Sequence, residues 1–256
     1  MPELPDVTVY IEALERRVRG KRLERVKLLN PFILRTAVPP ISQAEGKRVT
    51  GIRRVGKRIV LELEGPLYLV LHLMIAGRLR WLEPKERPPG RITLALLEFE
   101  NGTLAFTEAG TKRRASLHLL STLAGLDPGG AEVFAIDKGD FATRLRRENH
   151  TVKRALTDPH LFAATRAVLA EWVERLGTQS HGGFPEKVTA FRPEMAVHGR
   201  FGKPCPVCGA PVQRIVYAEN ECNYCARCQT GGVVLADRAL SRLLHKSWPR
   251  SIDALE

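Results

Sequence analysis

Two short motifs, Cys205-Pro206-Val207-Cys208-Gly209 and Cys225-Ala226-Arg227-Cys228, decide how the C-terminal quarter of this chain folds. The two cysteine pairs are separated by 16 residues. Two residues between paired cysteines allow both sulfur atoms to reach one tetrahedral ion from a tight turn. We therefore expect one structural zinc ion held by four thiolates, rather than disulfides or free thiols. Because four thiolates fill the coordination shell, catalysis must come from elsewhere.

The residues between the two pairs predict a β-hairpin. Val212, Arg214 and Val216 alternate as in a strand, and residues 218–220 are expected to turn the chain back. Cys222 is the fifth cysteine and has no partner in the motif. It is either a redox-sensitive thiol or alternate ligand, or an incidental small residue on the hairpin, and we favour the second reading.

Composition and charge favour a nucleic acid partner. The chain has 256 residues with 44% hydrophobic content, enough for one large domain or two modest ones. Its 40 Lys and Arg against 28 Asp and Glu give a net charge of +12, which indicates an anionic polymer, nucleic acid before a membrane surface. No apolar run resembles a signal peptide or approaches the ~20 residues of a membrane span, so we expect a cytoplasmic protein without a membrane partner.

The first half of the chain has the pattern of an α+β domain. Residues 7–18 carry apolar side chains at helical spacing, with Gly20 as a stop signal. Residues 22–119 contain short β-branched and aliphatic runs, including 58–63 and 67–73. Asn101-Gly102 lies between two further runs, 92–100 and 103–107, and is a strong hairpin signal. We expect one helix followed by an antiparallel β-sandwich or barrel.

Later segments read as helices between flexible connections. Residues 127–130 (Asp-Pro-Gly-Gly) predict a linker, residues 141–148 a charged helix, and an apolar stripe over residues 161–176 a second helix closed by Gly177. Residues 180–183 predict another flexible stretch. The expected organisation is an N-terminal catalytic domain over 2–120, a helical DNA-binding region over 131–180, a zinc finger over 195–237 and a tail over 238–256.

The chain begins Met1-Pro2-Glu3-Leu4-Pro5-Asp6. A small second residue allows removal of the initiator methionine, which would leave Pro2 with a free secondary amine. Free α-amines titrate near about 8, so a fraction is neutral at pH 7 and can attack an electrophilic sugar carbon. The adjacent carboxylate of Glu3 could move the protons that such a reaction requires. Alone, a Met-Pro-Glu start is common and carries little information.

Several motifs together resemble the Fpg/Nei family of bifunctional DNA glycosylases and AP lyases, and the first residues resemble its formamidopyrimidine-DNA glycosylase branch. The resemblance covers nearly the whole chain. It rests on the N-terminal residues, on Gly56-Lys57-Arg58, on residues 72–79 (His-Leu-Met-Ile-Ala-Gly-Arg-Leu) and on Val197-His198-Gly199-Arg200 before the four cysteines.

The resemblance implies roles for individual residues. Pro2 would be the nucleophile at C1′ of a damaged nucleotide, Glu3 would protonate the opening sugar, and Lys57 would contact phosphate or the leaving base. The Schiff base then permits β,δ-elimination, and the damaged base must first leave the helical stack. By residue type alone, Lys57 is more often a solvated charge. The implied partner is damaged double-stranded DNA, bound by a monomer in the nucleoid.

The sequence departs from the family pattern at four places. Ile75 stands where the family has a wedge methionine. The Asp-Pro-Arg-Arg-Phe-Gly motif is missing, and Arg113 lies in the corresponding basic stretch, either as a phosphate contact or in a solvated charge run. The Gly-x-Gly-Asn-x-Tyr-x-x-Glu motif is also missing, which indicates a shortened helix–two-turn–helix module in which Lys153 remains a candidate phosphate contact. Asn220 replaces a phosphate-binding arginine of the finger.

Three functions therefore remain open on the sequence. The first is an oxidised-base glycosylase with AP lyase activity, which we favour because Pro2 and Glu3 lie in a different domain from the shortened module. The second is a catalytically impaired protein of the same fold that binds damaged DNA. The third is an RNA-associated zinc-ribbon protein, which leaves the Pro-Glu start unexplained.

Overall fold

The computed structural model of the chain describes residues 2–110, 112–126, 132–146, 159–186, 188, 192–217, 220–235 and 243–255. The chain divides into two compact units, Met1–Ala190 and Phe191–Glu256, which are described separately. Among the helices of the described part, none combines the length and the apolar character that a membrane span needs.

The N-terminal unit begins with helix α1, Leu4–Val18. It starts three residues before the segment expected from its apolar spacing. Pro5 lies in its first turn, where the missing N–H costs nothing, and the carboxylate of Asp6 accepts a hydrogen bond from the Glu3 N–H at 2.9 Å. The apolar face, including Tyr10 and Leu14, is fully buried. The helix therefore carries the first residues of the chain on a fixed base.

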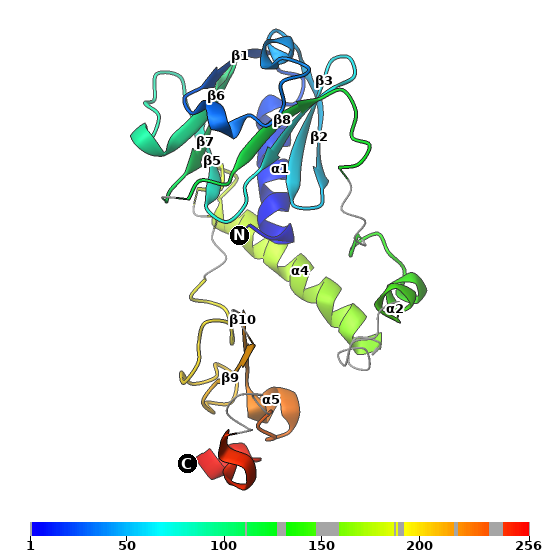
Figure 1. Cartoon of the computed structure of the whole chain (residues 1–256), viewed down its shortest axis with the longest axis vertical. Helices are drawn as coiled ribbons and strands as arrows, with labels where there is room; N and C mark the ends of the chain where they lie inside the picture. Colours follow the sequence, from blue (N-terminus) through cyan, green and yellow to red (C-terminus); the bar gives the residue numbers. More distant parts are fainter. Residues whose placement is uncertain are drawn as a thin grey trace. The chain divides into compact units, whose positions relative to one another are not determined.

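Two four-stranded antiparallel sheets form the sandwich that was expected (Figure 1). One has the order β1-β6-β7-β5 and the other β2-β3-β4-β8. The strands are β1 Leu23–Leu28, β2 Val49–Val55, β3 Arg58–Leu63, β4 Leu67–His72, β5 Gly77–Leu82, β6 Thr93–Phe99, β7 Gly102–Glu108 and β8 Ser116–Leu120. Short 3₁₀ turns, η1 Pro31–Ile33, η2 Ile41–Ala44 and η3 Gly90–Ile92, lie between them.

The Asn-Gly hairpin is confirmed, with Phe99 of β6 opposite Gly102 of β7. A Cβ atom on Gly102 would lie 2.5 Å from the Trp81 ring, so the sheet requires glycine there. Side chains from α1 and from both sheets form one buried core, of which Tyr10, Phe106 and Ile59 are fully buried members. Burial of this extent is the main stabilising contribution to the unit.

The helical region contains α2, Lys138–Arg146, and α4, Pro159–Gln179. Helix α4 packs against α1. The prediction that Gly177 ends the second helix was wrong, because the helix continues to Gln179. A single helical glycine costs only about 1 kcal/mol relative to alanine, and packing of Leu176, 6% exposed, offsets that cost. The linker at 127–130 and residues 147 and 148 lie outside the described residues.

The C-terminal unit is built around a hairpin of β9, Gln213–Tyr217, and β10, Asn220–Tyr224, followed by α5, Ala226–Thr230. The hairpin was predicted from sequence, although residues 218 and 219 of its turn lie outside the described part. Two further turns, η4 His245–Ser247 and η5 Ile252–Leu255, follow near the C-terminus.

The last residues of the chain pack back onto the hairpin. Val233 and Ser251 form an antiparallel bridge, and the N–H of Ile252 donates to the Gly232 carbonyl at 2.8 Å. The Ile252 side chain is 1% exposed and belongs to the same apolar cluster as Tyr224 and Cys225. The tail is therefore part of the folded finger.

Candidate active site and zinc centre

A carboxylate and an ammonium group meet at the N-terminal end of α1. Lys57, in the turn between β2 and β3, places its Nζ 2.9 Å from Oε1 and 2.8 Å from Oε2 of Glu3. The two residues are 54 positions apart in the sequence. Their side chains are 44% and 52% exposed, so the ion pair contributes at most about 1 kcal/mol to stability. An accessible pair of this kind is available to a ligand.

The neighbours of Glu3 hold it in place. Pro2 is buried in the chain that still carries Met1. Asp6 is 5% exposed, and its carboxylate fixes the Glu3 backbone through the hydrogen bond at the start of α1. Asp6 was not among the residues selected from sequence. An acidic residue three positions after a helix cap was the signal that could have identified it.

The connection between β4 and β5 forms a tight loop that presents Ile75. The N–H of Gly77 donates to the Leu73 carbonyl at 2.9 Å, and Met74 has a φ of 52°, in the left-handed region. The side chain of Ile75 is 59% exposed. An apolar side chain at the tip of an ordered loop has the form that a wedge between bases requires.

Arg58, His72 and His118 lie close together on strands β3, β4 and β8. His72 and His118 are half-buried, and the Nε2 atom of His118 lies 3.2 Å from the Ser116 hydroxyl. Burial lowers the pKa of both histidines, and the nearby Arg58 guanidinium lowers it further. In His72 the charges of His118 and Lys57 add to the effect. Both rings are therefore predominantly neutral at pH 7.

Arg113 lies on an exposed loop between β7 and β8, and its Nη2 donates to the Arg91 carbonyl at 2.9 Å. The loop is held by Glu108, which is 1% exposed and accepts hydrogen bonds from the N–H groups of Arg114 at 3.0 Å and Ala115 at 3.1 Å. These hydrogen bonds hold the loop that carries Arg113 in place. The predicted contact of Arg113 was with a DNA phosphate, whereas its side chain here contacts the Arg91 carbonyl.

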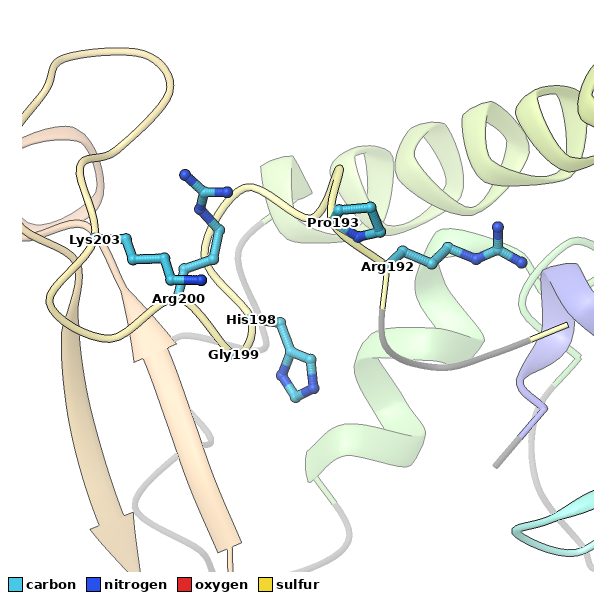
Figure 2. Close-up of a pocket in the computed structure, with 6 residues that line it drawn as sticks. All are labelled: Arg192, Pro193, His198, Gly199, Arg200 and Lys203. Atoms are coloured by element: carbon cyan, nitrogen blue, oxygen red, sulfur yellow. The ribbon is translucent and has the colours of Figure 1, made fainter. Parts of the chain in front are cut away.

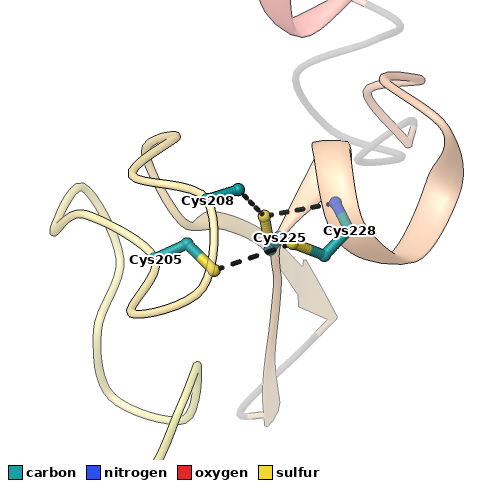
Figure 3. Close-up of side chains that lie close together, drawn as sticks. All are labelled: Cys205, Cys208, Cys225 and Cys228. Atoms are coloured by element: carbon teal, nitrogen blue, oxygen red, sulfur yellow. Dashed lines mark hydrogen bonds between the residues drawn. The ribbon is translucent and has the colours of Figure 1, made fainter.

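The four cysteines predicted to bind zinc lie together (Figure 3). The sulfur atoms of Cys205, Cys208, Cys225 and Cys228 all lie within 4.8 Å of one another. The N–H of Val207 donates to Cys205 Sγ and the N–H of Cys228 to Cys225 Sγ, both at 3.5 Å. Hydrogen bonds to thiolate sulfur are typical of such centres.

The protonation chemistry of the cysteines fits a divalent cation. Hydrogen bonds from the N–H groups of Val207 and Cys208 lower the pKa of Cys205 to about 7. Interaction with the sulfur atoms of Cys208 and Cys225 raises the pKa of Cys228 to about 12. Thiols this close together cannot all ionise without a cation between them. The four residues therefore hold one structural zinc ion, with no open position for water.

The C-terminal unit also contains a basic pocket of about 260 Å³ (Figure 2). Its lining includes Arg192, His198, Arg200 and Lys203. The Nη2 of Arg200 donates to the Pro204 carbonyl at 3.2 Å, whereas its Nε is buried and has no hydrogen-bond partner among the described residues. Four basic side chains around one pocket favour an anionic ligand. The Val-His-Gly-Arg motif was visible in the sequence, but it offered no reason to expect a pocket.

The structure does not describe the side chains of two residues that were predicted to contact DNA, Lys153 and Asn220. Lys153 lies outside the described residues. Asn220 begins β10 opposite Tyr217, and the position of its side chain is not described.

The chain matches known protein families at both ends. Residues 1–114 match the family described as formamidopyrimidine-DNA glycosylase N-terminal domain. Residues 202–231 match the zinc finger found in FPG and IleRS. The first match contains Glu3, Lys57 and Ile75, and the second contains all four cysteines of the zinc centre.

Solved structures share the fold. The MutM (FPG) protein from Thermus thermophilus superposes with a TM-score of 0.67 at 28% identity, covering 90% of this chain and 99% of that chain. The Lactococcus lactis FPG in complex with a FAPY-dG containing DNA gives a TM-score of 0.72 at 22% identity, covering 89% and 99%.

Two relatives that match over most of their length are formamidopyrimidine-DNA glycosylases. The formamidopyrimidine-DNA glycosylase of Thermus thermophilus is 31% identical over 276 residues, covering 91% of this chain and 100% of the relative. That of Symbiobacterium thermophilum is 29% identical over 287 residues, covering 93% of each. Both alignments are longer than the 256 residues of this chain, so each relative contains residues that have no counterpart here. The chain belongs to the formamidopyrimidine-DNA glycosylase family.

Proposed function

We propose that this protein is a base-excision-repair DNA glycosylase that removes oxidised bases and then cleaves the strand as an AP lyase. The observation that carries the proposal is the contact between Glu3 and Lys57 beside Pro2, at the first turn of α1. The N-terminal domain, over 2–120, would supply the chemistry. The helical region over 131–180 and the finger over 195–237 would bind DNA.

The chemistry begins at the secondary amine that Pro2 acquires when Met1 is removed. The nitrogen attacks C1′ of the damaged nucleotide, the N-glycosidic bond breaks, and the base leaves with a proton. The ring oxygen accepts a proton as the sugar opens, and the nitrogen and C1′ form an iminium. Loss of a proton from C2′ expels the 3′ phosphate, and a second elimination expels the 5′ phosphate.

Glu3 is placed to move these protons, since it follows Pro2 directly and is held by the Asp6 hydrogen bond. The Lys57 ammonium donates a hydrogen bond to the Glu3 carboxylate and can also donate to a phosphate oxygen or to the departing base. The exposed fractions of both side chains leave them reachable by a nucleotide that has rotated out of the duplex.

DNA binding is distributed over several basic features. Ile75 would fill the space that the rotated nucleotide leaves. Arg113, Lys153 and Asn220 remain proposed phosphate contacts. The pocket lined by Arg200 and its basic neighbours would accept a backbone phosphate through its positive charge. The zinc ion would only stiffen the hairpin, and the protein is proposed to act as a monomer in the cytoplasm.

Borohydride trapping tests the proposal. Protein with a processed N-terminus, incubated with duplex DNA containing an oxidised base or an abasic site, should form a covalent complex when the iminium is reduced. Pro2→Gly replaces the secondary amine with a primary amine and should slow trapping while leaving DNA affinity unchanged. Absence of any complex with a panel of oxidised bases and with the abasic control would sink the proposal.

A second candidate function follows from the missing Gly-Asn-x-Tyr segment. Loss of a phosphate-binding module could leave a protein that recognises damaged DNA without cutting it. The same assay separates the two: tight binding of abasic DNA with neither trapping nor cleavage supports the binding protein. Because Glu3 and Lys57 remain paired in the structure, we favour the enzyme.

A further inference from the structure

Arg78 makes contacts that its position at the start of β5 does not require. One of its guanidinium nitrogens, Nη1, donates to the Ile75 carbonyl at 3.1 Å and to the Gly77 carbonyl at 2.7 Å. The side chain therefore folds back over the loop that precedes it. The two hydrogen bonds tie the carbonyl of Ile75 to that of Gly77, on the C-terminal side of the exposed tip.

The loop has few other restraints within the described part of the chain. Its main-chain hydrogen bond runs from the Gly77 N–H to the Leu73 carbonyl, and Met74 occupies the left-handed region that a residue with a Cβ atom rarely adopts. Ordering a loop residue costs backbone entropy. Hydrogen bonds from a charged donor to two carbonyls are of the size needed to offset that cost for one residue.

The base of the loop is anchored to the helix that carries Pro2 and Glu3. Leu79, next to Arg78, donates its N–H to the Tyr10 hydroxyl at 3.3 Å, and that hydroxyl lies 3.4 Å from the Leu79 carbonyl. Tyr10 is fully buried in α1, and burial raises its pKa, so it remains a neutral donor. The carbonyl of Arg78 itself accepts from the Thr107 hydroxyl at 3.2 Å.

We infer that Arg78 is a positioning residue that holds Ile75 rigid for insertion into the DNA stack. The inference rests on the proposed function, because it assigns Ile75 the wedge role. A wedge that is already ordered does not lose loop entropy when it enters the duplex. More of the free energy of binding is therefore left to separate the stacked bases. The alternative role for an arginine here is a direct contact with a DNA phosphate.

Full-length zinc-loaded protein carrying Arg78→Met tests the inference. Wedge insertion is read from 2-aminopurine fluorescence, with the probe next to a lesion in the duplex, and excision of a paired oxidised base is measured under single-turnover conditions. Both should fall about tenfold, the effect of losing charge-assisted hydrogen bonds to a loop. Trapping on an abasic site, where no base has to be unstacked, should change less than about twofold.

Arg80→Met is the matched control. Arg80 lies two residues further along β5, and its charge is paired with Glu86 at 2.9 Å, away from the loop. This variant removes the same charge from the same strand, so it should leave wedge fluorescence unchanged. Equal unfolding transitions of the two variants would exclude a general loss of stability.

The salt dependence of binding distinguishes the alternative. A lost phosphate contact reduces the slope of log K against log salt by about 0.9 on undamaged DNA, and Arg78→Lys would restore it. A positioning role leaves that slope unchanged, and lysine, with its single charged atom, restores wedge insertion only in part. A reduced slope with unchanged fluorescence overturns the inference.

The outcomes also separate this inference from the proposed function. If the unmodified protein neither traps nor cuts any lesion, the enzyme proposal fails. The fluorescence of bound abasic or mismatched DNA still reports whether Arg78 controls Ile75.

Gly77→Ala provides a second variant, because its Cβ atom would clash with the Leu73 carbonyl oxygen and force the turn to open. It should reproduce the fluorescence loss.

Discussion

The contact between Glu3 and Lys57 contributes little to the stability of the fold, although it positions two groups proposed to act in the reaction. Both side chains are about half exposed, so their attraction is screened by water and contributes little to folding. The value of the pair lies in where it places two ionisable groups, beside Pro2 and at the start of a rigid helix. Substitutions here should therefore change the reaction without changing the fold.

Glu3→Gln is the direct test of this separation. Glutamine keeps the shape and can accept a hydrogen bond from Lys57, but it cannot transfer a proton. We expect excision of an oxidised base to slow by about 10²–10⁴-fold, the usual contribution of a general acid or base. The urea midpoint should remain within the change that a loss of about 1 kcal/mol produces. Full excision activity in the Glu3→Gln variant would contradict the assignment of Glu3.

His72 and His118 predict a pH dependence of stability. Their pKa values in the folded protein lie below the ordinary value of 6.5, because burial and Arg58 disfavour the charged form. Protonation therefore favours the unfolded chain. The stability contribution is complete above pH 6.5 and is lost as the pH falls from there through the folded pKa values.

Urea unfolding at pH 7.5, 6.5 and 5.5 checks whether the free energy of unfolding falls as the pH falls. NMR titration of the two imidazole rings checks whether the histidines cause the change. Arg58→Met should raise both pKa values toward 6.5 and flatten the acid side of the profile. Arg53→Met is the control, because Arg53 is on the same sheet and pairs with Glu62 at 2.6 Å. A profile that steepens in Arg58→Met, or flattens equally in both variants, would contradict the prediction.

At the scale of elements, local patterns were sufficient wherever a short segment determines its own conformation. Residues 58–63 were predicted as a strand from their apolar run and form β3 with the same bounds. The hairpin predicted at Asn101-Gly102 formed, with Glu100 and Asn101 in the turn and Gly102 as the first residue of β7. The cysteine spacing predicted the zinc centre, since each pair binds the ion from one turn.

Other features depend on contacts between distant segments. The hydroxyl of Tyr10 meets Leu79, 69 residues away, only because the tertiary fold brings α1 and β5 together. Arg78 folds back on its own loop, a choice of side-chain conformation that no residue pattern specifies. Gly177 does not end the helix, because the packing of α4 offsets the low helix propensity of glycine. Sequence alone could name Lys57 through family resemblance but not its contact with Glu3.

The C-terminal tail is an element that extends the finger beyond the 202–231 match. Ile252 is buried against the cluster that includes Cys205 and Cys225, and Trp248 Nε1 lies 3.5 Å from the Val234 carbonyl. Ile252→Ala should remove about 2–5 kcal/mol from the stability of this unit by leaving a cavity. Zinc should then transfer faster to a chromophoric chelator. Asp253→Ala, at an exposed ion pair with Arg227, is the control and should leave the transfer rate unchanged.

At the scale of the whole molecule, the division into two units predicts that loss of zinc has a local effect. The core of the N-terminal unit contains no zinc ligand, whereas the C-terminal unit has a small apolar cluster in which Cys205 and Cys225 take part. A unit of that size depends on its metal, because binding free energy becomes folding free energy when the ligands are not preformed. Removal of zinc should therefore unfold the C-terminal unit alone.

Calorimetry and limited proteolysis of the full chain with and without a strong chelator measure this directly. We expect the N-terminal transition to keep its midpoint, while residues 191–256 become sensitive to protease. Affinity for duplex DNA should fall and its salt dependence weaken, since Arg192, Arg200 and Lys203 no longer share a pocket. Borohydride trapping on abasic DNA at high protein concentration should survive, because Pro2, Glu3 and Lys57 lie in the other unit. Loss of the N-terminal transition on chelation would show that the two units fold as one.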